Sequence, residues 1–209
     1  AMTQERIGFI GLGMMGAAMA TRLQDAQQPL AVYNRTPEKA ASLLARGAVW
    51  CSSPGDIASS CNIIISMVST SEVLEELSLG PDGIIQGGKP GFLHADCSTV
   101  SPAVIAGLST ACRAHGGSFL HVPVLGSVTQ AAEGKLLLFA GGPEEAFRRI
   151  EKILRILGTH IWRFEEPSQA SHAKLICNLF IAGMITTLAE GLVFAEKAGL
   201  SPQVILEIL

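Results

Sequence analysis

Short apolar runs alternate with segments of helical length along most of the chain. The strongest run, Asn62–Met67, is centred on consecutive isoleucines, which is typical of a central strand buried on both faces of a parallel sheet. The predicted strands are Ile7–Ile10, Leu30–Tyr33, Ala48–Trp50, Asn62–Met67, Phe92–Ala95, Phe119–Val122, Lys135–Ala140 and His160–Phe164. The predicted helices are Met14–Leu23, Pro37–Ala45, a short one near Ile57, Glu72–Leu79, Pro102–Ala114 and Glu144–Leu157. This alternation predicts an α/β fold with a doubly wound sheet.

The pattern changes after Glu165-Glu166-Pro167. Ser168–Ala198 shows no strand pattern and no proline, so we expect one helix of about 31 residues. Gly199 suits the end of that helix, and Ser201-Pro202 suits the N-cap and first residue of another. The middle of the long helix is apolar on every side, so we expect it to be buried, with a second subunit as the cover. Residues 1–165 and 166–209 are therefore predicted to be separate domains, the second one truncated.

Composition and cysteine usage narrow the class of protein. Hydrophobic residues make up 48% of the 209 residues and charged residues 16%, which excludes intrinsic disorder. The formal net charge of −3 argues against broad nucleic-acid binding. The five cysteines are odd in number, scattered and without C-x-x-C spacing, which favours reduced thiols over disulfides or a metal site.

No targeting or membrane segment is expected. The N-terminus lacks the pattern of a secretory signal peptide. The longest apolar stretch, Leu175–Ala189, has 15 residues, whereas a membrane-spanning helix needs about 20. We therefore expect a soluble, cytoplasmic protein.

A G-x-G-x-x-G motif, Gly11-Leu12-Gly13-Met14-Met15-Gly16, stands between the first predicted strand and the first predicted helix. In this setting Gly11 permits a tight turn, Gly13 lets backbone N–H groups approach a pyrophosphate, and Gly16 lets the helix pack closely on the strand. The helix N-terminus also favours an anion. The alternative is a purely structural turn, but the context favours binding of a dinucleotide by these six residues.

The end of the second predicted strand bears on which dinucleotide is bound. NAD-specific sites place an Asp or Glu there to accept from the ribose hydroxyls, whereas this chain has Asn34-Arg35-Thr36. Arg35 can donate paired hydrogen bonds to a 2′-phosphate. The alternative is that Thr36 caps a helix and Arg35 is solvated. We favour NADP(H), with NAD(H) as the alternative.

Three further segments follow later strands and are candidates for the rest of the site. Val68 and Ser69 are placed to line the cofactor. Asp96-Cys97-Ser98-Thr99 and Pro123–Ser127 are small or polar and suit contact with cofactor and substrate, although each alone fits an ordinary turn equally well.

Lys174 and Asn178 lie four residues apart on the long predicted helix and therefore share one face. A lone charge is disfavoured in an apolar environment, and burial lowers the pKa of a lysine from about 10.4, which makes it a usable proton donor or acceptor. Spacing alone leaves two possibilities, a catalytic lysine or a lysine whose ammonium group reaches solvent.

Together, several segments resemble the β-hydroxyacid dehydrogenases, a family that includes 3-hydroxyisobutyrate dehydrogenase, 6-phosphogluconate dehydrogenase and the glyoxylate/succinic semialdehyde reductases. The matching segments are IGFIGLGMMGAAMA, VYNRTPEKA, DCSTVSP, VPVLGSVTQAAEGKLLLFAGG and AKLICNLF, in the family's order. The resemblance implies a Rossmann-type NADP-binding domain over residues 1–165 and the start of an all-helical substrate and dimerisation domain over residues 166–209.

The resemblance also implies roles for individual residues. Lys174 would be the catalytic acid/base, and Thr99 would contact the nicotinamide side of the cofactor. The implied substrate-binding residues are Ser98, Gly126, Ser127 and Asn178, with the main chain at Gly126 and Ser127 holding a carboxylate. Leu125-Gly126-Ser127 departs from the common Ser-Gly-Gly and looks closer to the glyoxylate/succinic semialdehyde reductases.

The expected activity is hydride transfer between a nicotinamide cofactor and a small 3-hydroxy acid or aldehyde acid, by a homodimer or a dimer-based tetramer. The alternatives are a non-catalytic dinucleotide-binding scaffold, which the presence of Lys174 disfavours, and an imine reductase, which usually lacks a lysine at that place. The five histidines show no ligand spacing and are expected to be structural. Cys97 has no evident histidine partner and is not expected to act as a nucleophile.

Overall fold

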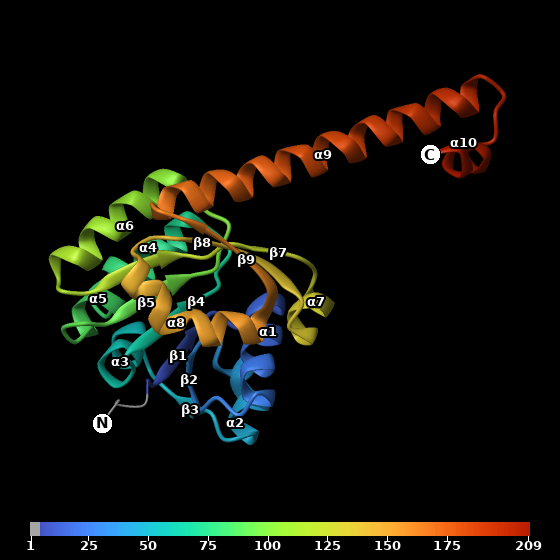
Figure 1. Ribbon diagram of the computed structural model, residues 1–209. Coiled ribbons are helices and arrows are strands. Elements are labelled where there is room, and N and C mark those ends of the chain that lie inside the picture. Colours follow the sequence, from blue (N-terminus) through green and yellow to red (C-terminus); the bar gives the residue numbers. More distant parts are fainter. Residues whose placement is uncertain (1–4) are drawn as a thin grey trace. The chain divides into compact units, whose positions relative to one another are not determined.

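The computed structural model describes residues 5–209, and within them nine strands form one sheet (Figure 1). The strands are β1 (Ile7–Ile10), β2 (Leu30–Tyr33), β3 (Val49–Trp50), β4 (Ile63–Ser66), β5 (Leu93–Asp96), β6 (Ser118–His121), β7 (Val124–Leu125), β8 (Leu136–Gly141) and β9 (Gly158–Phe164). Their order is β3-β2-β1-β4-β5-β6-β8-β7, with β9 paired to β8. The first six strands are parallel, in the order of a doubly wound dinucleotide-binding sheet, which confirms the predicted fold class.

The helices follow the predicted segments closely. They are α1 (Met14–Asp25), α2 (Ala41–Ala45), α3 (Pro54–Ser60), α4 (Ser71–Leu79), α5 (Ile84–Gly87), α6 (Pro102–Ala114), α7 (Val128–Glu133), α8 (Glu144–Leu157), α9 (Pro167–Lys197) and α10 (Pro202–Ile208). The predicted helix Pro37–Ala45 is divided into a 3-10 turn (Pro37–Ala40) and α2. The short elements α5, α7 and β7 are absent from the prediction, because four, six and two residues give too little periodicity.

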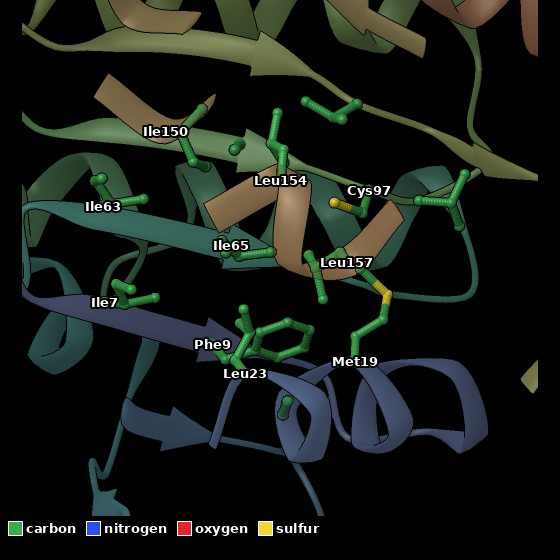
Figure 2. Close-up of a cluster of buried hydrophobic side chains, with 14 of the residues drawn as sticks. Ile7, Phe9, Met19, Leu23, Ile63, Ile65, Cys97, Ile150, Leu154 and Leu157 are labelled. Atoms are coloured by element: carbon green, nitrogen blue, oxygen red, sulfur yellow. The ribbon is translucent and has the colours of Figure 1, made fainter. Parts of the chain in front are cut away.

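Two hydrophobic clusters lie on opposite faces of the sheet, because successive side chains of a strand point to opposite faces. Phe9 and Ile65 belong to the cluster with α1 and α8, which Figure 2 shows in close-up. Ile10 and Ile64, one residue along the same strands, belong to the cluster with α3, α4 and α6. Burial on both faces explains the continuous apolar runs of the parallel strands.

The chain divides into two compact units between Lys174 and Leu175, within helix α9. In the second unit, Leu175–Leu209, large apolar side chains such as those of Leu179, Phe180 and Phe194 are exposed. Residues 5–209 therefore do not provide the predicted burial of the long helix, and cover by a second subunit stays a prediction. The predicted domain boundary at residue 165 also stays a prediction.

Helix α9 is long and apolar enough, by length and composition, to cross a membrane. The helix has 31 residues and contains an 18-residue window with a mean hydropathy of 1.7. The sequence-based expectation of no membrane span considers only the 15 apolar residues Leu175–Ala189, whereas the helix itself extends from Pro167 to Lys197. One such helix is weak evidence for a membrane, because core helices of soluble proteins meet the same criteria.

Candidate functional site

The carboxyl ends of β1 and β4 lie side by side at the point where the strand order reverses direction. In open α/β sheets, ligands bind outside the carboxyl ends of the strands at such a point. The predicted cofactor segments Gly11–Gly16 and Val68-Ser69 follow these two strands. We call this edge, where β1, β4, β5 and β6 end, the carboxyl edge.

The three motif glycines each meet a different requirement at the carboxyl edge. Gly11 has a φ of +92°, and a Cβ atom there would collide with the carbonyl oxygen of Met67. A Cβ atom on Gly16 would collide with the carbonyl oxygen of Gly11, so only glycine lets α1 approach the turn. A Cβ atom on Gly13 would meet nothing within 4 Å, so the space above Gly13 is open.

The N-terminus of α1 suits an anionic ligand. Its N-cap, Gly13, offers no side-chain hydrogen bond, and its first turn contains no acidic residue. The positive end of the helix dipole and its first N–H groups therefore have no carboxylate competing for them. Together with the open space at Gly13, these features fit the pyrophosphate of a dinucleotide.

The side chain of Asn34 links the glycine turn, Gly11–Gly16, to the end of β2 by hydrogen bonds. Its Oδ1 accepts from Leu12 N–H at 2.8 Å, and its Nδ2 donates to the Thr36 carbonyl oxygen at 2.8 Å. The predicted cofactor-binding residue Asn34 is therefore engaged in shaping both turns. Arg35 and Thr36 are exposed beside it, where a 2′-phosphate would have access to the guanidinium group.

A row of buried polar side chains crosses three neighbouring strands at the carboxyl edge. Ser66, Asp96 and His121 are register partners on β4, β5 and β6, and all are fully buried. Asp96 Oδ1 accepts from the hydroxyl of Ser66 at 2.7 Å, and its Oδ2 lies 3.3 Å from His121 Nδ1. His94 Nε2 lies 2.8 Å from Ser66 Oγ, and because that hydroxyl donates to Asp96, the imidazole must be the donor.

Ser98 continues this network into the loop after β5. Its hydroxyl donates to Asp96 Oδ1 at 2.8 Å and accepts from Val68 N–H at 2.9 Å. The loops after β4 and β5 are thereby joined. Ser98 is fully buried and its proton is given to Asp96, so in this arrangement it has no proton for a substrate carboxylate. Thr99, the next residue, is exposed. The substrate role of Ser98 stays a prediction.

The protonation states of this network follow from burial and neighbouring charge. Burial raises the pKa of Asp96, but the close contact and charge of His121, with smaller effects of His94 and Ser66, outweigh it and hold the pKa below its ordinary value. Burial lowers the pKa of His94 to about 4, against the opposing charge of Asp96. Burial raises the pKa of the Cys97 thiol, which agrees with the expectation that Cys97 is no nucleophile.

His94 is expected to make the protein less stable in mild acid. An unfolded histidine takes up a proton near pH 6.5, whereas folded His94 does so only near pH 4, so stability is lost as the pH falls through this window. The loss is about 3 kcal/mol at the lower end. Denaturant unfolding at pH 7 and pH 4.5 measures it, and His94→Gln should reduce the difference while the exposed control His172→Gln should not. An equal pH dependence in His94→Gln and wild type would contradict this assignment.

Helix α9 begins with a buried stripe that leads to Lys174. Pro167, Ala170, Ser171 and Lys174 are buried, at the spacing of one helical face. Ser171 Oγ donates to the Val100 carbonyl oxygen at 2.9 Å, so this face is attached to the loop after β5. Lys174 is only 7% exposed, which disfavours the solvent-reaching alternative. Asn178 is exposed, one turn further along α9 in the second unit.

Gly126 and Ser127 lie in the turn between β7 and α7. Ser127 is the N-cap of α7, where its hydroxyl accepts from Gln130 N–H and its own N–H donates to Gln130 Oε1 at 2.7 Å. Helix α7 packs beside α1, which starts in the glycine turn (Figure 1). A carboxylate that used the Ser127 N–H would have to displace Gln130, so this predicted role stays a prediction.

The predicted residues therefore separate into a connected set and an outlying set. Hydrogen bonds and close backbone approaches join the turns after β1, β2, β4 and β5 to the start of α9. Gly126 and Ser127 instead contact Gln130, and Asn178 is exposed. From the sequence, Asp96 is named only as part of the segment Asp96–Thr99, His94 and His121 are expected to be structural, and Ser66 is not named. Their signal is a polar residue near the end of each of three otherwise apolar strands.

Within residues 5–209, a cavity of about 370 Å³ lies on α9, lined by residues that include Glu190 and Phe194, but no metal centre competes with the carboxyl edge. That part of the chain holds no group of three or more potential metal-ligating side chains. A cavity of about 30 Å³ lined by residues that include Arg6, Asn62 and Lys89 lies at the opposite ends of the strands. Its volume suits one water molecule rather than a nucleotide.

Comparison with known proteins places this geometry in a family. Residues 6–165 match the family described as the NAD binding domain of 6-phosphogluconate dehydrogenase. The chain is 35% identical over 208 residues to the cytokine-like nuclear factor N-PAC of Danio rerio, covering 99% of this chain and 45% of that protein. It is 33% identical over 204 residues to the uncharacterized oxidoreductase YkwC of Bacillus subtilis, covering 98% of this chain and 71% of that protein. The chain thus spans less than half the length of N-PAC.

Solved structures agree with this placement. A 3-hydroxyisobutyrate dehydrogenase of Mycobacterium tuberculosis with L-serine superposes with a TM-score of 0.91 at 28% identity, over 99% of this chain and 70% of that one. Psf3 in complex with NADP+ and 2-OPP gives 0.88 at 29% identity, over 96% and 71%. An imine reductase of Streptomyces aurantiacus, at 21% identity, 95% and 69% coverage and a TM-score of 0.85, shares the fold. The chain belongs to the β-hydroxyacid dehydrogenase family, and residues 6–165 carry the family's NAD-binding domain.

Proposed function

We propose that the protein is an NADPH-linked reductase of small aldehyde or keto acids, or acts in reverse on a 3-hydroxy acid. The observation that carries this proposal is the burial of Lys174 on the face of α9 that Ser171 attaches to the loop after β5. A buried amine next to a dinucleotide-binding edge is suited to exchange a proton with a carbonyl or hydroxyl oxygen.

Each part of the reaction has a candidate in this chain. A bound nicotinamide cofactor supplies or accepts the hydride. Gly13 and the N-terminus of α1 bind the pyrophosphate, and Arg35 contacts the 2′-phosphate. Lys174 gives a proton to the carbonyl oxygen in reduction and takes it back in oxidation. The family resemblance assigns Asn178, Gly126 and Ser127 to the carboxylate of the substrate.

The test is NADPH oxidation by the full-length protein with a panel of carbonyl substrates. Glyoxylate, succinic semialdehyde and tartronate semialdehyde represent the proposed class, and a cyclic imine represents the imine reductases. Turnover with at least one of the three acids and none with the imine supports the proposal. Turnover with the imine alone would replace it with the imine reductase alternative.

A second candidate function is a non-catalytic dinucleotide-binding scaffold. The observation in its favour is the 35% identity to N-PAC, whose name describes a nuclear factor. Tight NADPH binding without turnover of any substrate in the panel would establish this alternative. Cytoplasmic location and a homodimeric state stay predictions from the sequence.

Replacing Arg35 with alanine is expected to weaken NADPH binding about 10- to 100-fold, which corresponds to one or two charge-assisted hydrogen bonds to the 2′-phosphate. NADH lacks this phosphate, so its Kd should stay within about twofold. Fluorescence titration with both cofactors measures the two values, and the exposed Lys39→Ala is the matched control. A wild-type preference for NADH, or an equal loss for both cofactors, would contradict the assignment.

A further inference from the structure

We propose that Ser171 is a positioning residue for Lys174, because its hydroxyl fixes the second turn of α9 on the loop Cys97–Val100. The proposal rests on the proposed function, in which Lys174 exchanges a proton with the substrate. It adds a residue that contacts neither substrate nor cofactor and acts through Lys174.

The contact itself is buried and joins distant parts of the chain. Ser171 is 1% exposed, and its Oγ donates to the carbonyl oxygen of Val100, 71 positions earlier, at 2.9 Å. Val100 is buried as well. A buried carbonyl group that loses a hydrogen-bond donor is costly, so this hydrogen bond holds the helix and the loop together more strongly than an exposed one would.

The loop that receives Ser171 is itself held in place. Two residues before Val100, the Ser98 hydroxyl donates to Asp96 and accepts from Val68 N–H. The backbone N–H of Ser98 also lies 3.2 Å from Asp96 Oδ2. Ser171 therefore attaches α9 to a segment whose position is fixed by the buried carboxylate and by the loop after β4.

The buried stripe places Lys174 directly after this contact. The first turn of α9 packs on Gly141 at the end of β8, where a Cβ atom would lie 2.9 Å from Ala170 Cβ and 3.0 Å from Pro167 Cα. Ser171 adds the next attachment, and Lys174 follows three residues later on the same face. Because each residue adds about 1.5 Å along a helix, Lys174 lies about 4.5 Å beyond the Ser171 attachment.

The first experiment reads the position of Lys174 without cofactor or substrate. The full-length protein is treated briefly with an amine-acylating reagent, and modification is mapped by mass spectrometry. Ser171→Ala should raise the rate at Lys174 at least tenfold, while the exposed Lys135 reacts equally in all variants. Ser168→Ala removes a hydroxyl from the same helix one turn earlier and should leave the Lys174 rate unchanged.

Buried Cys112 on α6 separates a local effect from general unfolding. If the Cys112 thiol becomes reactive in parallel with Lys174, Ser171 supports the whole fold and the proposal is wrong. Ser171→Thr keeps the hydroxyl and should restore protection of Lys174. An unchanged Lys174 rate in Ser171→Ala would also overturn the proposal.

The second experiment measures kcat, KM and the Kd of NADPH in the same variants. Misplacement of a catalytic group by about 1 Å can cost a factor of about 100, so Ser171→Ala should lower kcat about 10- to 100-fold with the Kd unchanged. A fall in active protein at constant kcat would indicate a merely structural role and contradict the proposal. If wild type shows no turnover with any substrate, the proposed function fails, while the labelling experiment still decides whether Ser171 positions Lys174.

Discussion

Replacing Lys174 with methionine is expected to lower kcat about 100- to 10,000-fold, the range that a positioned proton donor or acceptor contributes. Methionine fills a similar volume in the buried stripe of α9, so the helix should keep its packing. The Kd of NADPH should stay within about twofold, because the pyrophosphate and 2′-phosphate contacts lie on other elements. Steady-state kinetics and a fluorescence titration on the same preparation measure both effects.

Two control variants sharpen this result. Lys174→Arg keeps the positive charge but cannot release a proton near neutral pH, so its kcat should be nearly as low as that of Lys174→Met. Lys135→Met changes an exposed lysine and should have no effect. Full activity in Lys174→Met would remove Lys174 from the mechanism, and full activity in Lys174→Arg would reduce its role to that of a charge.

The variants Gly16→Ala and Gly13→Ala are expected to differ in their effects on stability and on cofactor affinity. At Gly16 the added methyl group collides with the Gly11 carbonyl, so Gly16→Ala should lower the free energy of unfolding by about 1–3 kcal/mol and weaken NADPH binding at least tenfold. At Gly13 the methyl group meets open space, so Gly13→Ala should fold normally and lose affinity only. Thermal unfolding and NADPH titration of each variant distinguish the two.

Gly107 provides the matched control for this pair. It lies inside α6 with nothing within 4 Å of an added Cβ atom, so Gly107→Ala should raise the free energy of unfolding by up to about 1 kcal/mol and leave NADPH affinity unchanged. Unaltered NADPH binding by Gly13→Ala would show that the pyrophosphate is bound elsewhere.

The bounds of helices whose terminal residues favour a helix start or end could be predicted almost to the residue. Helices α6 and α8 have the predicted bounds, and α6 starts at Pro102 after the capping hydroxyl of Ser101. The parallel strands were predicted because burial on both faces leaves an unbroken apolar run. Hydrophobic pattern alone does not specify pairing, and so the antiparallel contacts of β8 with β6 and β7 were not anticipated.

The glycine turn was predicted correctly because its requirements are local. A positive φ at Gly11 and close approach at Gly16 follow from a strand, a turn and a helix in sequence. Helix α7 has a comparable local signal, the capping box of Ser127 and Gln130, but its six residues carry too little periodicity to be noticed.

The buried polar network could not be predicted in this way. Ser66, Asp96 and His121 are separated by 30 and 25 positions, and only the strand order and register make them neighbours. The bridging amide of Asn34 was missed for a related reason, since Oδ1 and Nδ2 could each have faced a ligand, the solvent or the backbone. The hydrogen-bond partner of a polar side chain depends on three-dimensional geometry that residue spacing does not contain.

The double hydrogen bond of Asn34 constrains how cofactor selectivity could be redesigned. The usual exchange would install aspartate at the end of β2 to attract the ribose of NADH. Aspartate at position 34 could still accept from Leu12 N–H, but its second oxygen would face the Thr36 carbonyl oxygen that Nδ2 now serves. The resulting repulsion would disturb residues 34–36, and through Asn34 also the glycine turn at Leu12 that faces the pyrophosphate. A successful redesign must therefore rebuild residues 34–36 as one unit.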